Sequence, residues 1–343
     1  MQKNSKNRKN RRVLLFLMLL VSTGAMLSTA TYAWFTANKN VSINTINVQV
    51  EAQNGIQIST NGTTWKAAIN NADILAGYSG SVNQLPLTLE PVSTAGNIDE
   101  DGHLEMFYGD VKTSGDLFYL TATKETDQAE TVTDSGEEGY RAKGKYLAFD
   151  VFFKVNIDTP VYLTTSSGVT SNNLNSADAP IKNATRVGFV TLGNTTDGDT
   201  LANIQALNAG TNSDLVIWEP NYNVHTNSAI NHAKDTYGLT ITADNAKLAY
   251  DGVKAVIEED DEILVGDANA DEYADFFGSV TTQIATKEGT GFDTYQELFT
   301  LNKGITKVRL YVWVEGQDVD CENNASGGAL NFNLQVSTNA AAE

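Results

Sequence analysis

Apolar and polar residues alternate in four stretches of the chain. The most regular stretch is residues 145–157, in which every odd position from Leu147 onward is apolar. The same period of two recurs at residues 307–315, 46–52 and 330–336. Because successive side chains of a strand point to opposite faces, each stretch predicts a strand with one face in a core and the other toward water.

Turn and helix signals complete this pattern. Asn54-Gly55 is a typical hairpin turn, and it predicts that the strand at 46–52 folds back onto residues 56–59. Less regular strands are expected at residues 85–89, 104–108, 117–122, 161–165, 186–192 and 214–218. Short helices are expected at residues 64–76, 271–284 and 294–301.

The order of these elements predicts a mostly β protein. The expected fold is an antiparallel, jelly-roll-like β-sandwich with short helical insertions at about residues 60–80 and 245–302. A single domain over residues 34–343 is the simplest organisation, and a division near residue 200 is the alternative.

The first 33 residues have the order of an export signal. Six basic residues and no acidic residue occupy the first twelve positions, residues 13–21 are apolar, and small residues follow. Cleavage is expected after Ala30 or after Ala33. Without cleavage, residues 13–33 are long enough to span a bilayer as an anchor. The sequence therefore predicts a signal peptide or transmembrane anchor at 1–33, and a domain that is secreted or held at the cell surface.

The charge of the chain excludes two classes of partner. The protein has 23 basic and 42 acidic residues, and removal of the first 33 residues leaves 17 basic residues and a net charge of −25. Such a domain repels nucleic acid and anionic lipid, so contact with a membrane is expected only through the N-terminal segment. Cys321 is the only cysteine, which excludes a disulfide within the chain.

Acidic loops are the only candidates for a metal site. Asp267, Asn269 and Asp271 have the spacing of the first half of a calcium loop. The glycine and glutamate that an EF-hand requires further on are replaced by Glu272 and Gly278. The prediction is therefore a looser structural Ca²⁺ site, with an exposed acidic turn before a helix as the alternative. No protease or hydrolase motif occurs, so no enzymatic activity and no other cofactor are expected.

Four aromatic residues are candidates for a binding surface. Alternation places Tyr311 and Trp313 on the outer face of their strand, and Trp218 and Tyr222 lie in and after another predicted strand. Aromatic rings on a sheet can stack on sugars, which gives one functional hypothesis, a monomeric surface adhesion or glycan-binding module. The other interpretation is that a second sheet or inserted segments cover these rings.

The junction between the export signal and the first strand carries a resemblance. Thr31, Tyr32, Ala33, Trp34 and Phe35 precede a polar stretch and a strand, and this junction resembles that of the camelysin/TasA group of exported Gram-positive surface proteins. The resemblance implies a jelly-roll fold and export through a dedicated, SipW-type signal peptidase. The protease activity attributed to camelysin is not carried over, because the chain has no zinc motif.

The resemblance also implies a mode of assembly. Some members of the group form extracellular matrix fibres by donor-strand exchange, in which the N-terminus of one subunit completes the sheet of the next. In this chain the donor segment would be residues 34–50, with apolar contacts from Trp34, Phe35, Ile43, Ile46, Val48 and Val50. The expected function is thus a structural surface protein, a biofilm-matrix or fibre subunit whose partners are copies of itself or other matrix proteins. The other interpretation of the segment is an ordinary first strand of its own sandwich.

Overall fold

The computed structural model describes most of the chain after residue 44. The described residues are 45–52, 55–114, 117–125, 144–171, 179–227, 229–231, 262–264, 284–286, 296–316, 318, 320–321 and 329–339. Residues 1–33, for which an export signal is predicted, lie outside these ranges, and so do Trp34, Phe35, Ile43 and the predicted calcium ligands Asp267, Asn269 and Asp271. Within the described ranges, no helix has the length and apolar character needed to cross a membrane.

Strands dominate the described residues, which confirms the prediction of a mostly β protein. The strands are β1 (Thr45–Ala52), β2 (Gln57–Ser59), β3 (Ala68–Asn70), β4 (Asn83–Gln84), β5 (Met106–Ser114), β6 (Leu117–Glu125), β7 (Leu147–Val155), β8 (Thr159–Leu163), β9 (Gly168–Ser171), β10 (Thr185–Thr195), β11 (Asp214–Glu219), β12 (Glu262–Leu264), β13 (Ile284–Ala285), β14 (Gln296–Leu301), β15 (Gly304–Val314) and β16 (Ala329–Ser337). The described helices are short and comprise α2 (Asn71–Ala76), α3 (Ala179–Asn183), α4 (Leu201–Gln205) and a 3-10 turn at Gly210–Asn212.

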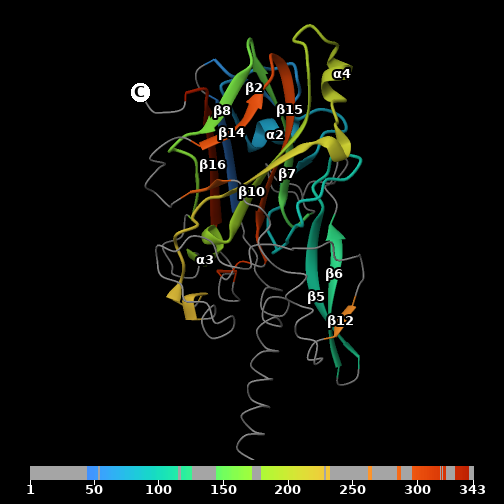
Figure 1. Ribbon diagram of the computed structural model, residues 1–343, viewed down its shortest axis with the longest axis vertical. Helices are drawn as coiled ribbons and strands as arrows, with labels where there is room; N and C mark the ends of the chain where they lie inside the picture. Colours follow the sequence, from blue (N-terminus) through green and yellow to red (C-terminus); the bar gives the residue numbers. More distant parts are fainter. Residues whose placement is uncertain are drawn as a thin grey trace, which may run out of the picture.

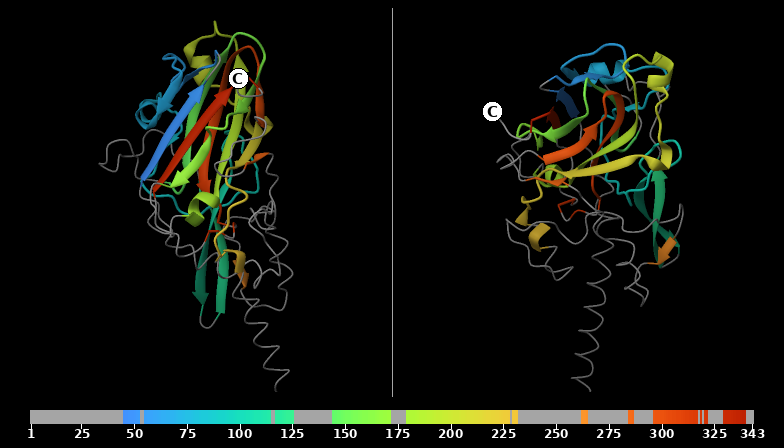
Figure 2. Two further views of the ribbon diagram at one scale, coloured as in Figure 1. Left: turned by 90° about the vertical axis from the view of Figure 1, so that its left-hand side faces the viewer. Right: turned by 45° about the horizontal axis from the view of Figure 1, so that its top comes forward.

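Two large sheets enclose the main core (Figure 1). The first, here called the β1 sheet, has the order β14-β8-β16-β1-β3, with β9 also paired to β16. The second, the β15 sheet, has the order β13-β11-β10-β15-β7-β2, with β4 also paired to β7. Inward side chains of both sheets, such as Val50, Phe332, Phe149 and Leu310, form one buried cluster. A third sheet of β12, β6 and β5 extends beyond this sandwich as a long hairpin (Figure 2).

The apolar residues that alternate along β7 and β15 point into the core as predicted. The outer face of β15, in contrast, is not exposed to water. Every residue of β15 is buried, including the polar residues that were expected to face water. Residues 82–106 pass over the outer face of this strand, and Val82, Val92, Leu104 and Met106 of this segment form a second buried cluster with Tyr311 and Trp313. The β15 sheet is therefore covered on both sides, which alternation within one strand cannot reveal.

Two further predictions, the hairpin after the N-terminal strand and the purely antiparallel sheets, are wrong. β1 and β2 do not form a hairpin, since β1 belongs to the first sheet and β2 pairs with β7 in the second. The chain crosses between the sheets at this turn because apolar residues on both sides of it belong to the shared core. β1 instead pairs in parallel with β16, and β11 pairs in parallel with β13, so the sheets are mixed rather than purely antiparallel.

The predicted helices are only partly present in the described residues. Of the helix expected at 64–76, only Asn71–Ala76 is helical, and Ala68–Asn70 forms β3. The helix expected at 294–301 is wrong, because Gln296–Leu301 forms β14 and pairs with β8. Its Leu298 and Leu301 are buried in the core between the sheets, and this long-range packing outweighs the local helix preference.

Candidate functional site

β1 lies between two other strands of its sheet. It pairs with β16 in parallel through eight residue pairs, from Thr45 opposite Ala329 to Ala52 opposite Val336. Figure 2 shows the two strands side by side and pointing the same way. On the other side, β3 covers β1 through only three pairs, at Gln49–Glu51.

The inward residues of β1 are fully engaged in the core. Val48, Val50 and Ala52 are 3%, 0% and 7% exposed. Each aliphatic side chain of the size of valine contributes about 1.5–3 kcal/mol when it is withdrawn from water. Of the predicted donor residues, the structure thus brings Val48 and Val50 into the core, and Ile46 is paired with Leu330 in the same strand register.

The segment that follows β2 holds the outer edge of β1. The backbone N–H of Val48 donates to Oδ1 of Asn71 at 2.9 Å, and that of Ala52 donates to the carbonyl of Ala67 at 2.8 Å. Asn70 and Asp73 form a capping box at the start of α2, which fixes the position of Asn71. Residues 67–73 therefore hold the edge of β1 that faces away from β16.

Polar side chains form a ladder on the outer face of the β1 sheet. Nε2 of Gln335 donates to Oε2 of Glu51 at 2.9 Å, and Nε2 of Gln49 donates to the other carboxylate oxygen of Glu51. Oγ1 of Thr164 donates to Oε1 of Gln335 at 2.6 Å. The ladder connects β1 to β16 and to the segment after β8.

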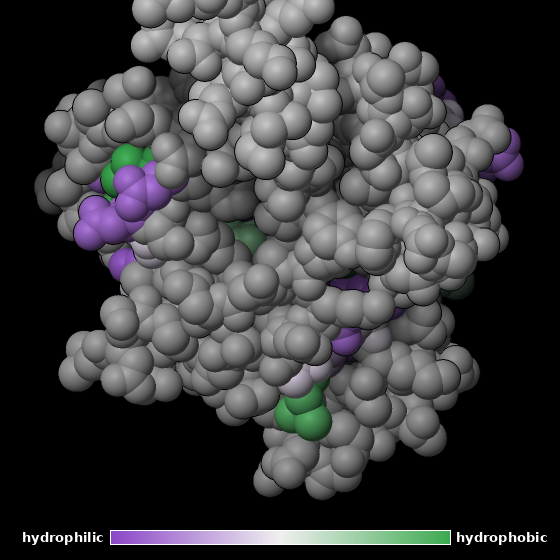
Figure 3. All heavy atoms as spheres, turned by 90° about the horizontal axis from the view of Figure 1, so that it is seen from below, coloured by the Kyte–Doolittle hydropathy of each residue, from purple (hydrophilic) through white to green (hydrophobic). Residues whose placement is uncertain are grey.

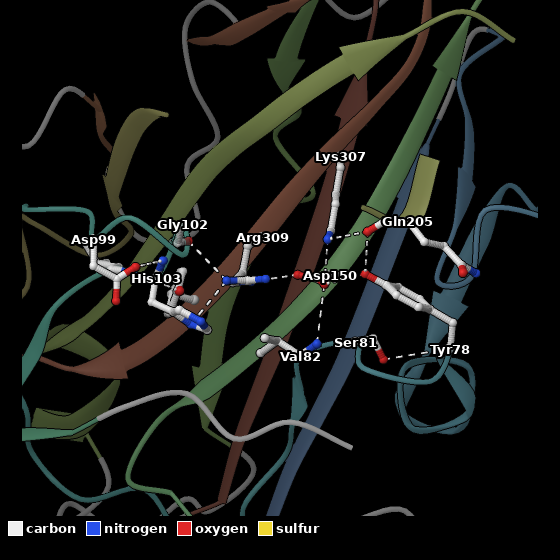
Figure 4. A network of polar contacts seen from close by, with 12 residues as sticks. Tyr78, Ser81, Val82, Asp99, Gly102, His103, Asp150, Gln205, Lys307 and Arg309 are labelled. Carbon is white, nitrogen blue, oxygen red and sulfur yellow. Dashed lines mark hydrogen bonds and ion pairs between the residues drawn. The ribbon is translucent and has the colours of Figure 1, made fainter. Parts of the chain in front are cut away.

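A buried ion network lies on the outer face of the β15 sheet (Figure 4). Asp150 of β7 accepts from Nε of Arg309 at 2.7 Å and lies 3.3 Å from Nζ of Lys307, both on β15. The hydroxyl of Tyr78 donates to Asp150 at 3.1 Å, and Lys307 donates to the carbonyl of Gln205 at 3.0 Å. The network ties two covering loops to the sheet.

The electrostatics of this network stabilise the ionised carboxylate. Burial alone would raise the pKa of Asp150, but the charges of Arg309 and Lys307 outweigh burial and lower it. Burial lowers the pKa of Lys307, and it raises the pKa of Tyr78, with Asp150 adding to that increase. Asp150 is thus held as an anion by two cations, which suits an ion pair and not a proton-transfer group.

A second charged cluster lies where β11 and β15 end. Nη2 of Arg186 contacts Asp318 at 2.6 Å and Glu219 at 3.1 Å, and all three side chains are buried. Nδ1 of His225 lies 2.6 Å from Oδ2 of Asp320, whose other oxygen accepts from the N–H of Thr226 at 2.9 Å. The cluster links the segment after β11 to the segment after β15.

The surroundings of the histidine in this cluster raise its pKa. Burial would lower the pKa of His225, but the hydrogen bond and charge of Asp320, with smaller effects of Asp318 and Glu219, raise it. Burial also raises the pKa of Asp320, and the nearby Asp318 adds to that increase. Within the described residues, no group of three or more His, Cys, Asp and Glu side chains is arranged to hold a metal ion.

The predicted binding aromatics do not form an exposed surface. Trp218, Tyr311 and Trp313 are at most 1% exposed, and Tyr222 is half-buried. Of the two interpretations, the structure supports the one in which inserted segments cover the rings, since residues 82–106 lie over Tyr311 and Trp313, and Trp218 packs in the main core. The hydroxyl of Tyr311 accepts from the N–H of Leu104 at 3.0 Å, and Nε1 of Trp218 donates to Thr286 at 2.9 Å.

Apolar side chains are scarce on the described surface. Ile157 and Leu201 are the large apolar residues exposed there. In the view from below, the coloured residues show only small, separate hydrophobic areas (Figure 3). This part of the surface therefore offers no broad apolar contact area for a ligand.

Comparison with known proteins adds no assignment to these sites. No family model, curated protein or solved structure matches the chain.

Neither charged cluster was predicted from the sequence. Lys307 and Arg309 alternate with apolar residues, and so does Asp150, a pattern typical of solvated outer faces. The available signal was that opposite charges occur on the outer faces of the two most regular strands. Whether they meet depends on the strand order and register, here Arg309 opposite Asp150, which the sequence does not give.

Proposed function

We propose that this protein is an exported structural subunit of the cell surface, with a jelly-roll fold, which assembles with copies of itself by exchange of β1. In the assembled form, β1 of one copy occupies the place between β16 and β3 of the next copy. The observation that carries the proposal is that the first described strand fills a slot in the middle of its own sheet.

The order of the chain supports this proposal. β1 precedes all other described strands, so it can leave the sheet without pulling another strand through the fold. Its outer edge is covered by three β3 pairs and two further hydrogen bonds. Its departure exposes the groove in the core that Val48 and Val50 fill, and an identical strand restores every contact that was lost.

The energetics of exchange follow from this identity. The same residues fill the same slot in the monomer and in the assembly, so the contact energies cancel. The balance is then set by protein concentration and by the conformation of the connection between β1 and β2, which joins the exchanged strand to the rest of its own chain. Because donor and acceptor surfaces differ, each copy can give one strand and receive one, which produces open chains when the rotation between copies does not close.

A reversible lock on β1 tests the proposal. Gln49 and Asn333 are direct neighbours across the parallel pair, so Gln49→Cys with Asn333→Cys in a Cys321→Ala background can form a disulfide within one chain. The exported protein is concentrated with and without reductant and inspected by negative-stain electron microscopy. Fibres are expected only in the reduced sample, because the oxidised strand cannot leave its own sheet.

Two controls isolate the effect of the lock. The Cys321→Ala protein without the added pair should form fibres in both conditions, and a chain without residues 34–50 should form none. Fibres of equal number from the oxidised and reduced protein would contradict strand exchange. Monodisperse particles from every variant would contradict the structural function itself.

A further inference from the structure

We propose that the contact between Glu51 and Gln335 selects the donor strand, so that the partner recognised at this slot is a second copy of this chain in one fixed register. The inference rests on the proposed strand exchange and names the residues by which the acceptor recognises the incoming strand.

Glu51 is the single charge in this pair of strands. β1 reads Thr-Ile-Asn-Val-Gln-Val-Glu-Ala, and β16 carries no charged residue. The carboxylate of Glu51 is half-buried and accepts from Nε2 of Gln335 at 2.9 Å. An ionised carboxylate is an acceptor only, and hydrogen bonds to charged groups are stronger than those between neutral groups.

Gln335 is held by residues that remain when β1 leaves. Its Oε1 accepts from Thr164 at 2.6 Å, its backbone N–H donates to Oγ of Ser167 at 2.9 Å, and its carbonyl accepts from the same hydroxyl at 2.8 Å. With its side-chain oxygen engaged, the amide presents only N–H toward the slot. The copy that receives the strand therefore already presents an N–H donor, which suits a hydrogen-bond acceptor on the incoming strand.

The position of the carboxylate distinguishes one register from the others. A slip of one residue would turn Val48 and Val50 toward water, so the apolar face already excludes it. A slip of two residues keeps that face inward but places Gln49 or Gln53 opposite Gln335 in place of Glu51. Only the observed register pairs the charge with the prepared donor.

A complementary pair of variants tests the inference. In Glu51→Lys, a donor faces the amide donor of Gln335, and in Gln335→Glu, two carboxylates face each other, so each variant is mismatched within its own chain. In a mixture, the lysine introduced at position 51 of one copy meets the glutamate introduced at position 335 of the other. The unchanged Glu51 of the second copy likewise meets the unchanged Gln335 of the first. Both contacts between copies are then matched, while both contacts within a chain are not.

The measurement is retention of an untagged copy by an affinity-tagged copy, with both proteins exported, purified and mixed at high concentration. The mixture of the two variants should retain at least about tenfold more untagged protein than either variant mixed with itself, as expected for one charged hydrogen bond. Glu100→Lys is the matched control, because it makes the same change of charge at an exposed position outside the β1 sheet. Its mixture with Gln335→Glu should show no such gain.

The outcomes separate this inference from the proposed function. If tagged wild-type protein retains untagged wild-type protein but the complementary mixture shows no gain, the Glu51–Gln335 contact does not select the strand. If wild-type protein retains none, strand exchange itself is contradicted. A chain with both substitutions restores the match and should be retained by its own tagged form as the wild type is. A failure of that chain to be retained, although it unfolds cooperatively on heating, would also overturn the inference.

Discussion

Asp150 illustrates how single residues hold the covering loops on the β15 sheet. This residue is 3% exposed, and its carboxylate is the shared partner of Arg309, Lys307 and Tyr78. Removing two cations and an anion from water is costly, and their mutual contacts offset that cost only while all of them remain. The network is therefore sensitive to the loss of the one carboxylate.

The substitution Asp150→Asn should destabilise the protein strongly. It leaves Arg309 and Lys307 buried without their counter-charge, for which a loss of about 3–5 kcal/mol in the free energy of unfolding is expected. Urea denaturation followed by tryptophan fluorescence measures this loss. Asp197→Asn is the control, because Asp197 is exposed where it pairs with Lys154 and should change stability by less than about 1 kcal/mol. Equal effects of the two substitutions would contradict the structural role of the network.

His225 should make stability depend on pH. The pKa of this histidine is raised in the folded protein, so its contribution is fully present below the unfolded pKa of about 6.5 and is lost as pH rises through the folded pKa. The groups that face it are the carboxylates of Asp320, Asp318 and Glu219, with Arg186 beside the last two.

The substitution His225→Asn removes this titration. The variant should be about 1–3 kcal/mol less stable than the wild type at acidic pH, and the difference should shrink as pH rises. Urea denaturation of both proteins at a series of pH values gives the two curves. A difference that stays constant across the series would show that His225 does not carry a proton in the folded cluster.

Among the elements, β15 is the strand on which the β15 sheet is built. It pairs with β10 on one side and β7 on the other, and both of its faces are buried. The strand begins at Gly304, where φ is +117° and a Cβ atom would lie 2.1 Å from the carbonyl oxygen of Thr195. Only glycine allows β10 and β15 to approach this closely.

The substitution Gly304→Ala should therefore move the start of β15. A backbone conformation of this kind costs other residues about 1–3 kcal/mol, and the clash with the Thr195 carbonyl adds to it. The midpoint of thermal unfolding should fall clearly. Gly198→Ala is the matched control, because a Cβ atom there meets nothing within 4 Å and its midpoint should stay near that of the wild type. A similar decrease in both variants would exclude close approach as the cause.

At the scale of the whole molecule, the two sheets differ in how firmly they are enclosed. The β15 sheet lies between the main core and the second cluster formed by residues 82–106, whereas β1 has the core on one face and partly exposed polar side chains on the other. Segments with fewer enclosing contacts open at lower free energy than the global unfolding reaction.

Amide hydrogen exchange should reveal this difference. Under native conditions the amides of β1 are expected to exchange through a partial opening, while those of β7 and β15 exchange only with global unfolding. Mass spectrometry of peptides from the three strands measures the rates. Equal protection of β1 and β15 would mean that β1 does not leave the sheet on its own, which would weaken the case for exchange.

The fold and the sites were predictable to different degrees. The period of two identified β1, β7, β15 and β16 and their inward faces, because it depends only on residues that are neighbours in the chain. The burial of Trp313 was not predictable in this way, since it requires residues 82–106 to pass over the strand. Gly188, which is paired with Tyr311, leaves room for the indole of Trp313, since a Cβ atom there would lie 3.2 Å from that ring, but this contact also depends on the register of β10 and β15.

By itself, the sequence determined that the chain builds strands with one apolar face, and it set the excess of acidic residues. The tertiary structure alone decided that β1 lies in parallel beside β16, that charges on the outer faces of β7 and β15 are buried together, and that His225 meets Asp320. The physical reason is distance along the chain. Alternation is a local property, whereas strand order, register and coverage arise from contacts between residues that are as far apart as Glu51 and Gln335.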